Sequence, residues 1–101
     1  MITNVLINES TTDGDKGAIQ WDGGVGTVHA AGTWDGASLT LEYKPAEARS
    51  DIEPDFAPTD LVLTSSVAVK NFFLGSGQIR VVQAGSGSTT SLTAHAVKAR
   101  V

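Results

Sequence analysis

Hydrophobic and polar residues alternate most clearly over residues 38–43, Ser-Leu-Thr-Leu-Glu-Tyr. Leu39, Leu41 and Tyr43 occupy every second position, and polar side chains separate them. Because successive side chains of a β-strand point to opposite faces of a sheet, this spacing predicts a strand with one buried and one solvated face.

Further runs of β-branched and apolar residues have the same character, and turn-forming segments such as Asp22-Gly23-Gly24 and Gly75-Ser76-Gly77 separate them. We expect about eight strands, no substantial helix and an all-β fold, an antiparallel β-sandwich with Greek-key or jelly-roll-like connections. Residues 8–17 are expected to form a loop. The remaining predicted strands are residues 2–8, 18–21, 25–34, 61–64, 67–74, 78–83 and 91–97.

The dipeptide Asp35-Gly36 stands between two of these strands. A two-residue type I′ turn needs positive φ at both central residues, and Asp-Gly meets that need well. The sequence therefore predicts a β-hairpin that joins residues 25–34 to residues 38–43 through this turn.

Residues 45–60 break the alternation, because Pro45, Pro54 and Pro58 all fall here among acidic side chains. Proline removes a backbone donor, so no strand ladder is expected in this segment. We interpret it as a Pro-rich crossing loop within a single domain that spans residues 1–101. The predicted core consists of Val5, Ile7, Trp34, Leu39, Leu41, Leu63, Val69, Phe72, Ile79, Val81 and Leu92, with Trp21 and Tyr43 partly buried.

Composition and charge limit the classes of partner that the chain is expected to bind. The 101 residues include no cysteine and carry a formal net charge of −4, without a run of Lys or Arg. That balance argues against partners such as nucleic acid or an anionic membrane surface. The first residues lack the pattern of a signal peptide, and no apolar stretch approaches the roughly 20 residues of a membrane span. We expect a soluble protein made in the cytoplasm.

Side chains capable of catalysis or metal binding are few. His29 and His95 each stand in a predicted strand without a close partner, which favours structural or solvent-facing histidines over ligands. The carboxylates at Asp13/Asp15 and Asp51/Glu53/Asp55 allow a hydrolytic pair or a calcium site, but solvated loop carboxylates are the preferred interpretation. We therefore expect no enzyme, no catalytic residue, no cofactor and no metal ligand.

The glycine-rich segments and the tryptophans each have a plain structural interpretation. Gly75-Ser76-Gly77 and Gly85-Ser86-Gly87-Ser88 lack the lysine and the helix of a phosphate-binding loop. Trp21 and Trp34 are expected to anchor the core, although a sugar-stacking platform on a carbohydrate-binding module stays open as the alternative.

Two stretches of the chain resemble small bacteriophage virion proteins. Residues 32–43, Gly-Thr-Trp-Asp-Gly-Ala-Ser-Leu-Thr-Leu-Glu-Tyr, look like a recurrent strand-turn-strand pattern of such proteins. Residues 78–82, followed by 85–87 and 90–94, are similar to their C-terminal half. The resemblance covers roughly residues 25–99, and the Pro-rich segment replaces the tryptophan-containing hairpin that often follows the first pattern.

The resemblance implies a non-enzymatic virion structural protein, a capsid decoration or cement protein that binds the major capsid protein or another virion protein. A homo-oligomer on the particle is expected, and a tail, neck or fibre component is the alternative. For attachment we predict the N-terminal residues and the stiff Pro-rich segment, although capping of one end of the fold would also explain the latter. The predicted partner interface is Ile2, Val5, Ile52 and Phe56.

Overall fold

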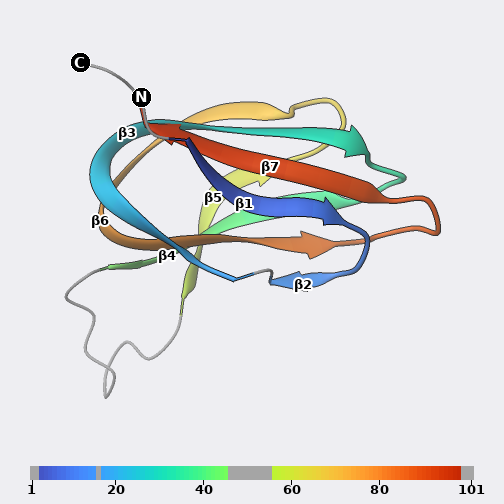
Figure 1. Ribbon diagram of the computed structural model, residues 1–101, viewed down its shortest axis with the longest axis horizontal. Helices are drawn as coiled ribbons and strands as arrows, with labels where there is room; N and C mark the ends of the chain where they lie inside the picture. The colour runs from blue at the N-terminus through green and yellow to red at the C-terminus, as the bar shows by residue number, and fades with distance from the viewer. Residues whose placement is uncertain (1–2, 16, 46–55, 99–101) are drawn as a thin grey trace.

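The computed structural model describes residues 3–15, 17–45 and 56–98, with side chains described from residue 5 onward (Figure 1). These residues form strands and connecting turns, and no helix long and apolar enough to cross a membrane is found among them. The strands are β1 (Thr3–Ser10), β2 (Gly14–Asp15), β3 (Ile19–Thr33), β4 (Ser38–Pro45), β5 (Ala57–Leu63), β6 (Val69–Ala84) and β7 (Ser91–Lys98).

All seven described strands belong to one antiparallel sheet in the order β1-β7-β3-β6-β4-β5, and the short β2 pairs with β6 beside this path. The prediction of an all-β antiparallel fold is confirmed. The structure does not confirm the sandwich or the Greek-key details. The strand number is seven instead of about eight, because two predicted pairs of strands merge and β2 lies in the expected loop.

Two long strands, β3 and β6, explain the mergers. Gly23 and Gly24 have φ of 92° and 104°, so the segment predicted as a turn bends β3 without ending it. Asp22 pairs with Ser76 of β6, which places the second predicted turn opposite the first. The Ser76 hydroxyl donates a hydrogen bond of 2.9 Å to the Asp22 carbonyl. Both strands therefore bend at the same place and continue beyond the bend (Figure 1).

The turn at Asp35-Gly36 has the predicted local geometry. Asp35 has φ of 45° and Gly36 has φ of 85°, and the Ala37 amide donates a 2.9 Å hydrogen bond to the Trp34 carbonyl. The hairpin prediction is nevertheless wrong, because β3 and β4 do not pair and β6 lies between them.

The Thr89 amide donates a 3.1 Å hydrogen bond to the Asp35 carboxylate. This backbone bond, with a smaller contribution from the Thr89 side chain, lowers the pKa of Asp35.

The buried hydrophobic residues form one cluster to which every strand except β2 contributes. Seven predicted core residues are buried as expected: Ile7, Leu39, Leu41, Leu63, Ile79, Val81 and Leu92. Val5 and Val69 were placed in the core wrongly, since each is 52% exposed. A register shift in β1 between Val5 and Ile7 reverses the alternation there. Trp21 is buried more completely than predicted, whereas Trp34 and Phe72 are half-buried at the border of the cluster.

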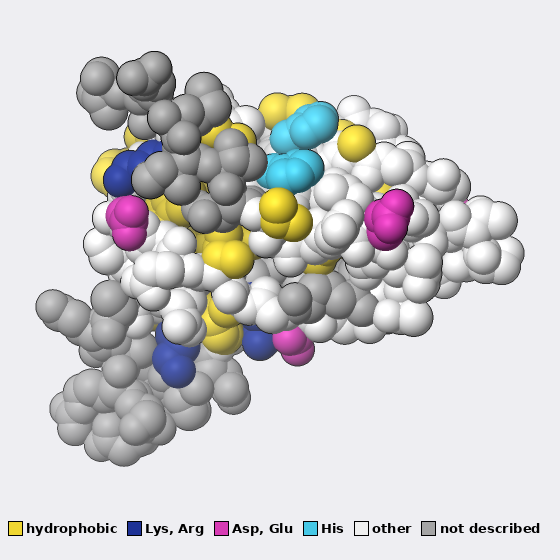
Figure 2. All heavy atoms as spheres, in the orientation of Figure 1, with side chains coloured by type: hydrophobic (Ala, Val, Ile, Leu, Met, Phe, Trp, Pro, Cys, Tyr) yellow, Lys and Arg dark blue, Asp and Glu magenta, His cyan; other side chains and the backbone are white. Residues whose placement is uncertain are grey.

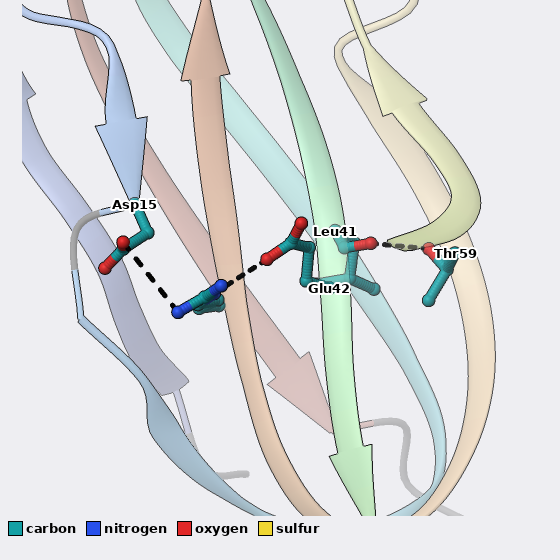
Figure 3. Close-up of polar contacts among 5 residues, drawn as sticks. Asp15, Leu41, Glu42 and Thr59 are labelled. Atoms are coloured by element: carbon teal, nitrogen blue, oxygen red, sulfur yellow. Dashed lines mark hydrogen bonds and ion pairs between the residues drawn. The ribbon is translucent and has the colours of Figure 1, made fainter. Parts of the chain in front are cut away.

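The ends of the Pro-rich segment belong to strands, which corrects the expectation that prolines exclude them. Pro45 ends β4, and Pro58 lies in β5, an edge strand whose outer side needs no ladder partner. The Thr59 hydroxyl donates a 2.8 Å hydrogen bond to the Leu41 carbonyl at the register shift between β4 and β5 (Figure 3). Residues 46–55 lie outside the described residues.

Candidate functional site

The most distinctive surface of the molecule is the outer face of β1, β7, β3 and β6. Side chains that alternate with the buried ones point outward here, and on this face several of them are apolar. We call these exposed residues, together with two histidines among them, the outer-face patch; its members are Val5, Val25, His29, Val69, Phe73 and His95.

The register places four of these side chains in one row across the four strands. Val5 of β1 is opposite His95 of β7, His95 is opposite His29 of β3, and His29 is opposite Val69 of β6. Figure 2 shows the histidine side chains together on this face, with hydrophobic side chains on both sides of them. Each histidine therefore has the other as its neighbour on the adjacent strand, so the expectation that neither has a close partner is wrong.

Phe73 gives the patch its largest apolar side chain. It is 76% exposed and lies directly opposite Val25, which is also exposed. Its neighbour Phe72 turns inward and packs against Trp21, with 4.8 Å between ring centroids. An exposed phenylalanine paired with an exposed valine leaves apolar surface in water, which is typical of a binding surface.

A groove of about 300 Å³ adjoins the patch at Phe73. It opens between edge strand β5 and the first half of β6, and Leu61, Phe72 and Leu74 supply its apolar lining. Asp60 and Lys70 also line it, one from each strand. The groove has the dimensions to accept one or two side chains of a partner.

A polar cluster occupies the other half of the sheet. Arg80 donates a 2.7 Å hydrogen bond from Nε to Glu42, which lies directly opposite it on β4, and its Nη1 is 3.8 Å from Asp15 (Figure 3). The Arg80 guanidinium also lies over the ring of Phe56, 4.3 Å from the ring centroid. These contacts hold the start of β5 against β6. They also pair the positive charge of Arg80 with groups of the same chain, so this charge is not free for a partner.

The four predicted interface residues meet different outcomes. Val5 is exposed and belongs to the outer-face patch. Phe56 is half-buried beneath Arg80, so part of its ring already has an intramolecular partner. Ile2 and Ile52 lie outside the described residues, as do Asp51, Glu53 and Asp55, the candidate cation ligands.

The tryptophans offer little to a sugar. Trp21 is 1% exposed, so its platform role in a carbohydrate-binding module is excluded. Trp34 is half-buried, packs against the core, and its carbonyl accepts a 3.0 Å hydrogen bond from the Thr90 hydroxyl.

Sequence reasoning missed most of the patch. The core predicted from the sequence includes both Val69 and Phe72, and it leaves out Phe73. One signal was present, because Val69 and Phe72 lie three positions apart and cannot both face inward in a regular strand. The histidine pair has no local signal, since it depends on the register between β3 and β7.

Comparisons of the chain with protein-family models, with curated proteins and with solved structures found no match.

Proposed function

We propose that this chain is a non-enzymatic structural protein of a bacteriophage virion, a capsid decoration protein that docks on the lattice of the major capsid protein. The observation that carries the docking role is the outer-face patch, above all the exposure of Phe73. The virion assignment draws on the resemblance of residues 32–43 and 78–94 to such proteins.

Burial of the patch would supply much of the binding free energy. Covering an exposed Phe or Val side chain gains about 1.5–3 kcal/mol each, before the costs of association are subtracted. Phe73 also lies beside the groove between β5 and β6, so a partner can enclose its ring while filling the groove. A domain of this size has little excess stability, and docking on a repeating surface adds to it.

The N-terminal residues 1–8 and the Pro-rich segment of residues 45–60 belong to the same proposal as additional contacts. Val5 places β1 in the patch, which supports a contact through the described part of the predicted N-terminal segment. Ile52 remains a predicted anchor. Because Phe56 contacts Arg80, its replacement would disturb the fold, and Ile52→Ser is the cleaner probe of the segment.

The test compares binding to capsids assembled without this protein. The double variant Phe73→Ser with Val69→Ser should fold normally and bind at least about tenfold more weakly, since two exposed apolar contacts are removed. Val62→Ser is the matched control, because Val62 is an exposed valine that belongs neither to the patch nor to the lining of the groove. Thermal unfolding of all three proteins shows whether a loss of binding has another cause.

Failure of the unmodified protein to bind such capsids would refute capsid decoration. So would virions that lack the protein and resist heat as well as complete ones. The number of copies per particle then separates the alternatives: hundreds indicate the shell, and about a dozen or fewer indicate a tail, neck or fibre component.

A further inference from the structure

His29 and His95 lie directly opposite each other on adjacent antiparallel strands, β3 and β7. Directly opposite residues on one face of a sheet have Cβ atoms about 4.5–5.5 Å apart. Two imidazoles bound to one Zn²⁺ need nitrogen atoms roughly 3.3 Å apart, given Zn–N distances of about 2.0–2.1 Å. Rotation about the side-chain bonds brings two opposite histidines into that range.

The surroundings of the pair suit a cation. Val5 and Val69 bound the pair at its two ends, so each imidazole has the other as its polar neighbour along the row. His29 is exposed and His95 is half-buried, which leaves the pair accessible to an ion.

The paired residues that form the neighbouring rows on β7, β3 and β6 have uncharged side chains. Thr27, Val97 and Asn71 occupy the row on one side, and Ala31 and Thr93 occupy the row on the other. The Thr27 hydroxyl donates a 2.8 Å hydrogen bond to the Asn71 side chain, which satisfies both groups within their own row. No lysine or arginine belongs to these rows, and the acidic residue Glu9 of β1 lies beside Thr93, because its amide donates a 3.0 Å hydrogen bond to Thr93 Oγ1.

We propose that His29 and His95 together bind one divalent transition-metal ion such as Zn²⁺ or Ni²⁺, with water in the remaining positions. Imidazole nitrogen is a preferred ligand of these ions, whereas Mg²⁺ and Ca²⁺ prefer oxygen. Among the described residues no group of three or more His, Asp or Glu could hold an ion, so this part of the chain supplies two ligands to an open site. This proposal is independent of the virion assignment.

The test is a titration of the full chain, without an affinity tag, with ZnCl₂ or NiCl₂, followed by calorimetry and by the imidazole proton resonances. We expect one ion per chain, with the resonances of both histidines changing together. His29→Asn and His95→Asn should each weaken binding roughly tenfold or more, because the second imidazole then no longer acts as an intramolecular ligand. MgCl₂ and CaCl₂ should leave the resonances unchanged.

A swap of two residues gives the matched control. His95→Ser combined with Ser91→His preserves the composition and keeps both histidines on the outer face, because Ser91 and His95 alternate in step along β7. It separates them by about 13 Å along the strands, since position 91 lies four residue steps of roughly 3.3 Å from position 95. The swap should bind Zn²⁺ as weakly as the single variants.

Equal Zn²⁺ affinity of the swap and the unmodified chain would overturn the proposal. So would a titration in which the unmodified chain binds no more tightly than His29→Asn. Thermal unfolding without metal identifies any variant whose weaker binding reflects loss of the fold.

Discussion

Gly26 is the position at which one added methyl group should be felt most strongly. It lies in β3 opposite Phe72, and the side chains of Trp21 and Phe72 cover its Cα. A Cβ atom at this position would lie 2.5 Å from Cη2 of Trp21 and 2.8 Å from Cζ of Phe72. Carbon atoms in ordinary contact are about 3.5–4.0 Å apart, so the two rings would have to move by about 1 Å.

Neither ring moves easily. Trp21 is 1% exposed and the two ring centroids are 4.8 Å apart. Overpacking of this kind costs about 1–3 kcal/mol, and the lower chain entropy of unfolded Ala relative to Gly returns about 0.4–1 kcal/mol. The 2.5 Å approach places this case near the upper end of the overpacking cost. We therefore expect Gly26→Ala to lower the free energy of unfolding by about 2 kcal/mol, which corresponds to a melting temperature roughly 8–16 °C lower.

Chemical denaturation followed by tryptophan fluorescence, together with thermal unfolding followed by circular dichroism, measures this loss. Gly75→Ala is the matched control, because Gly75 also lies in a paired strand and a Cβ there meets only the Tyr43 hydroxyl, at 3.2 Å. We expect the control to differ from the unmodified protein by less than about 1 kcal/mol. A Gly26→Ala protein as stable as the control would refute this account of the Trp21 and Phe72 contact.

Three further predictions follow from the turn and the polar cluster. Gly36→Val should lower the free energy of unfolding by about 1–3 kcal/mol, because valine is strained at a φ of 85°; unchanged thermal unfolding would contradict this. The lowered pKa of Asp35 contributes stability above the pKa of the unfolded chain, and this contribution is lost as the pH falls through the folded pKa. The unmodified protein should therefore lose stability relative to Asp35→Asn in denaturation measured from pH 5 down to pH 2, and parallel profiles would exclude the effect. Glu42→Gln should cost about 1 kcal/mol in denaturant unfolding, since it weakens a charge-assisted bond to Arg80, and no change would show that the bond adds nothing.

The local features of the fold were predictable from the sequence. Leu39 and Leu41 are buried because alternate residues of a strand share a face, and that property needs no knowledge of the partner strand. The positive φ values at Asp35 and Gly36 are equally local, since they follow from the residue types at the turn.

The pairing of strands was not predictable in the same way. An Asp-Gly turn fixes the backbone over four residues, but it does not determine whether the flanking strands bond to each other or to β6. Gly23 and Gly24 were ambiguous for another reason. Their positive φ values are compatible both with a turn that ends a strand and with a bend within one paired strand.

The candidate site depended on both kinds of information. Val5 faces outward because of a register shift in β1, and the residue types in β1 do not predict this shift. His29 and His95 meet only because β3 and β7 align in one register among several that alternation allows. A sequence pattern identifies which residues share a face, and only the paired sheet identifies which of them are neighbours.

The bend shared by β3 and β6 also affects how the chain folds. These strands pair residues from the first third of the chain with residues from the last third, so the central contacts close long loops and form at a high entropic cost. Folding should therefore be slow for a chain of this size. Both strands run through the bend without interruption, so the two halves of the sheet on either side of it share β3 and β6. We expect the two halves to be lost in a single cooperative transition.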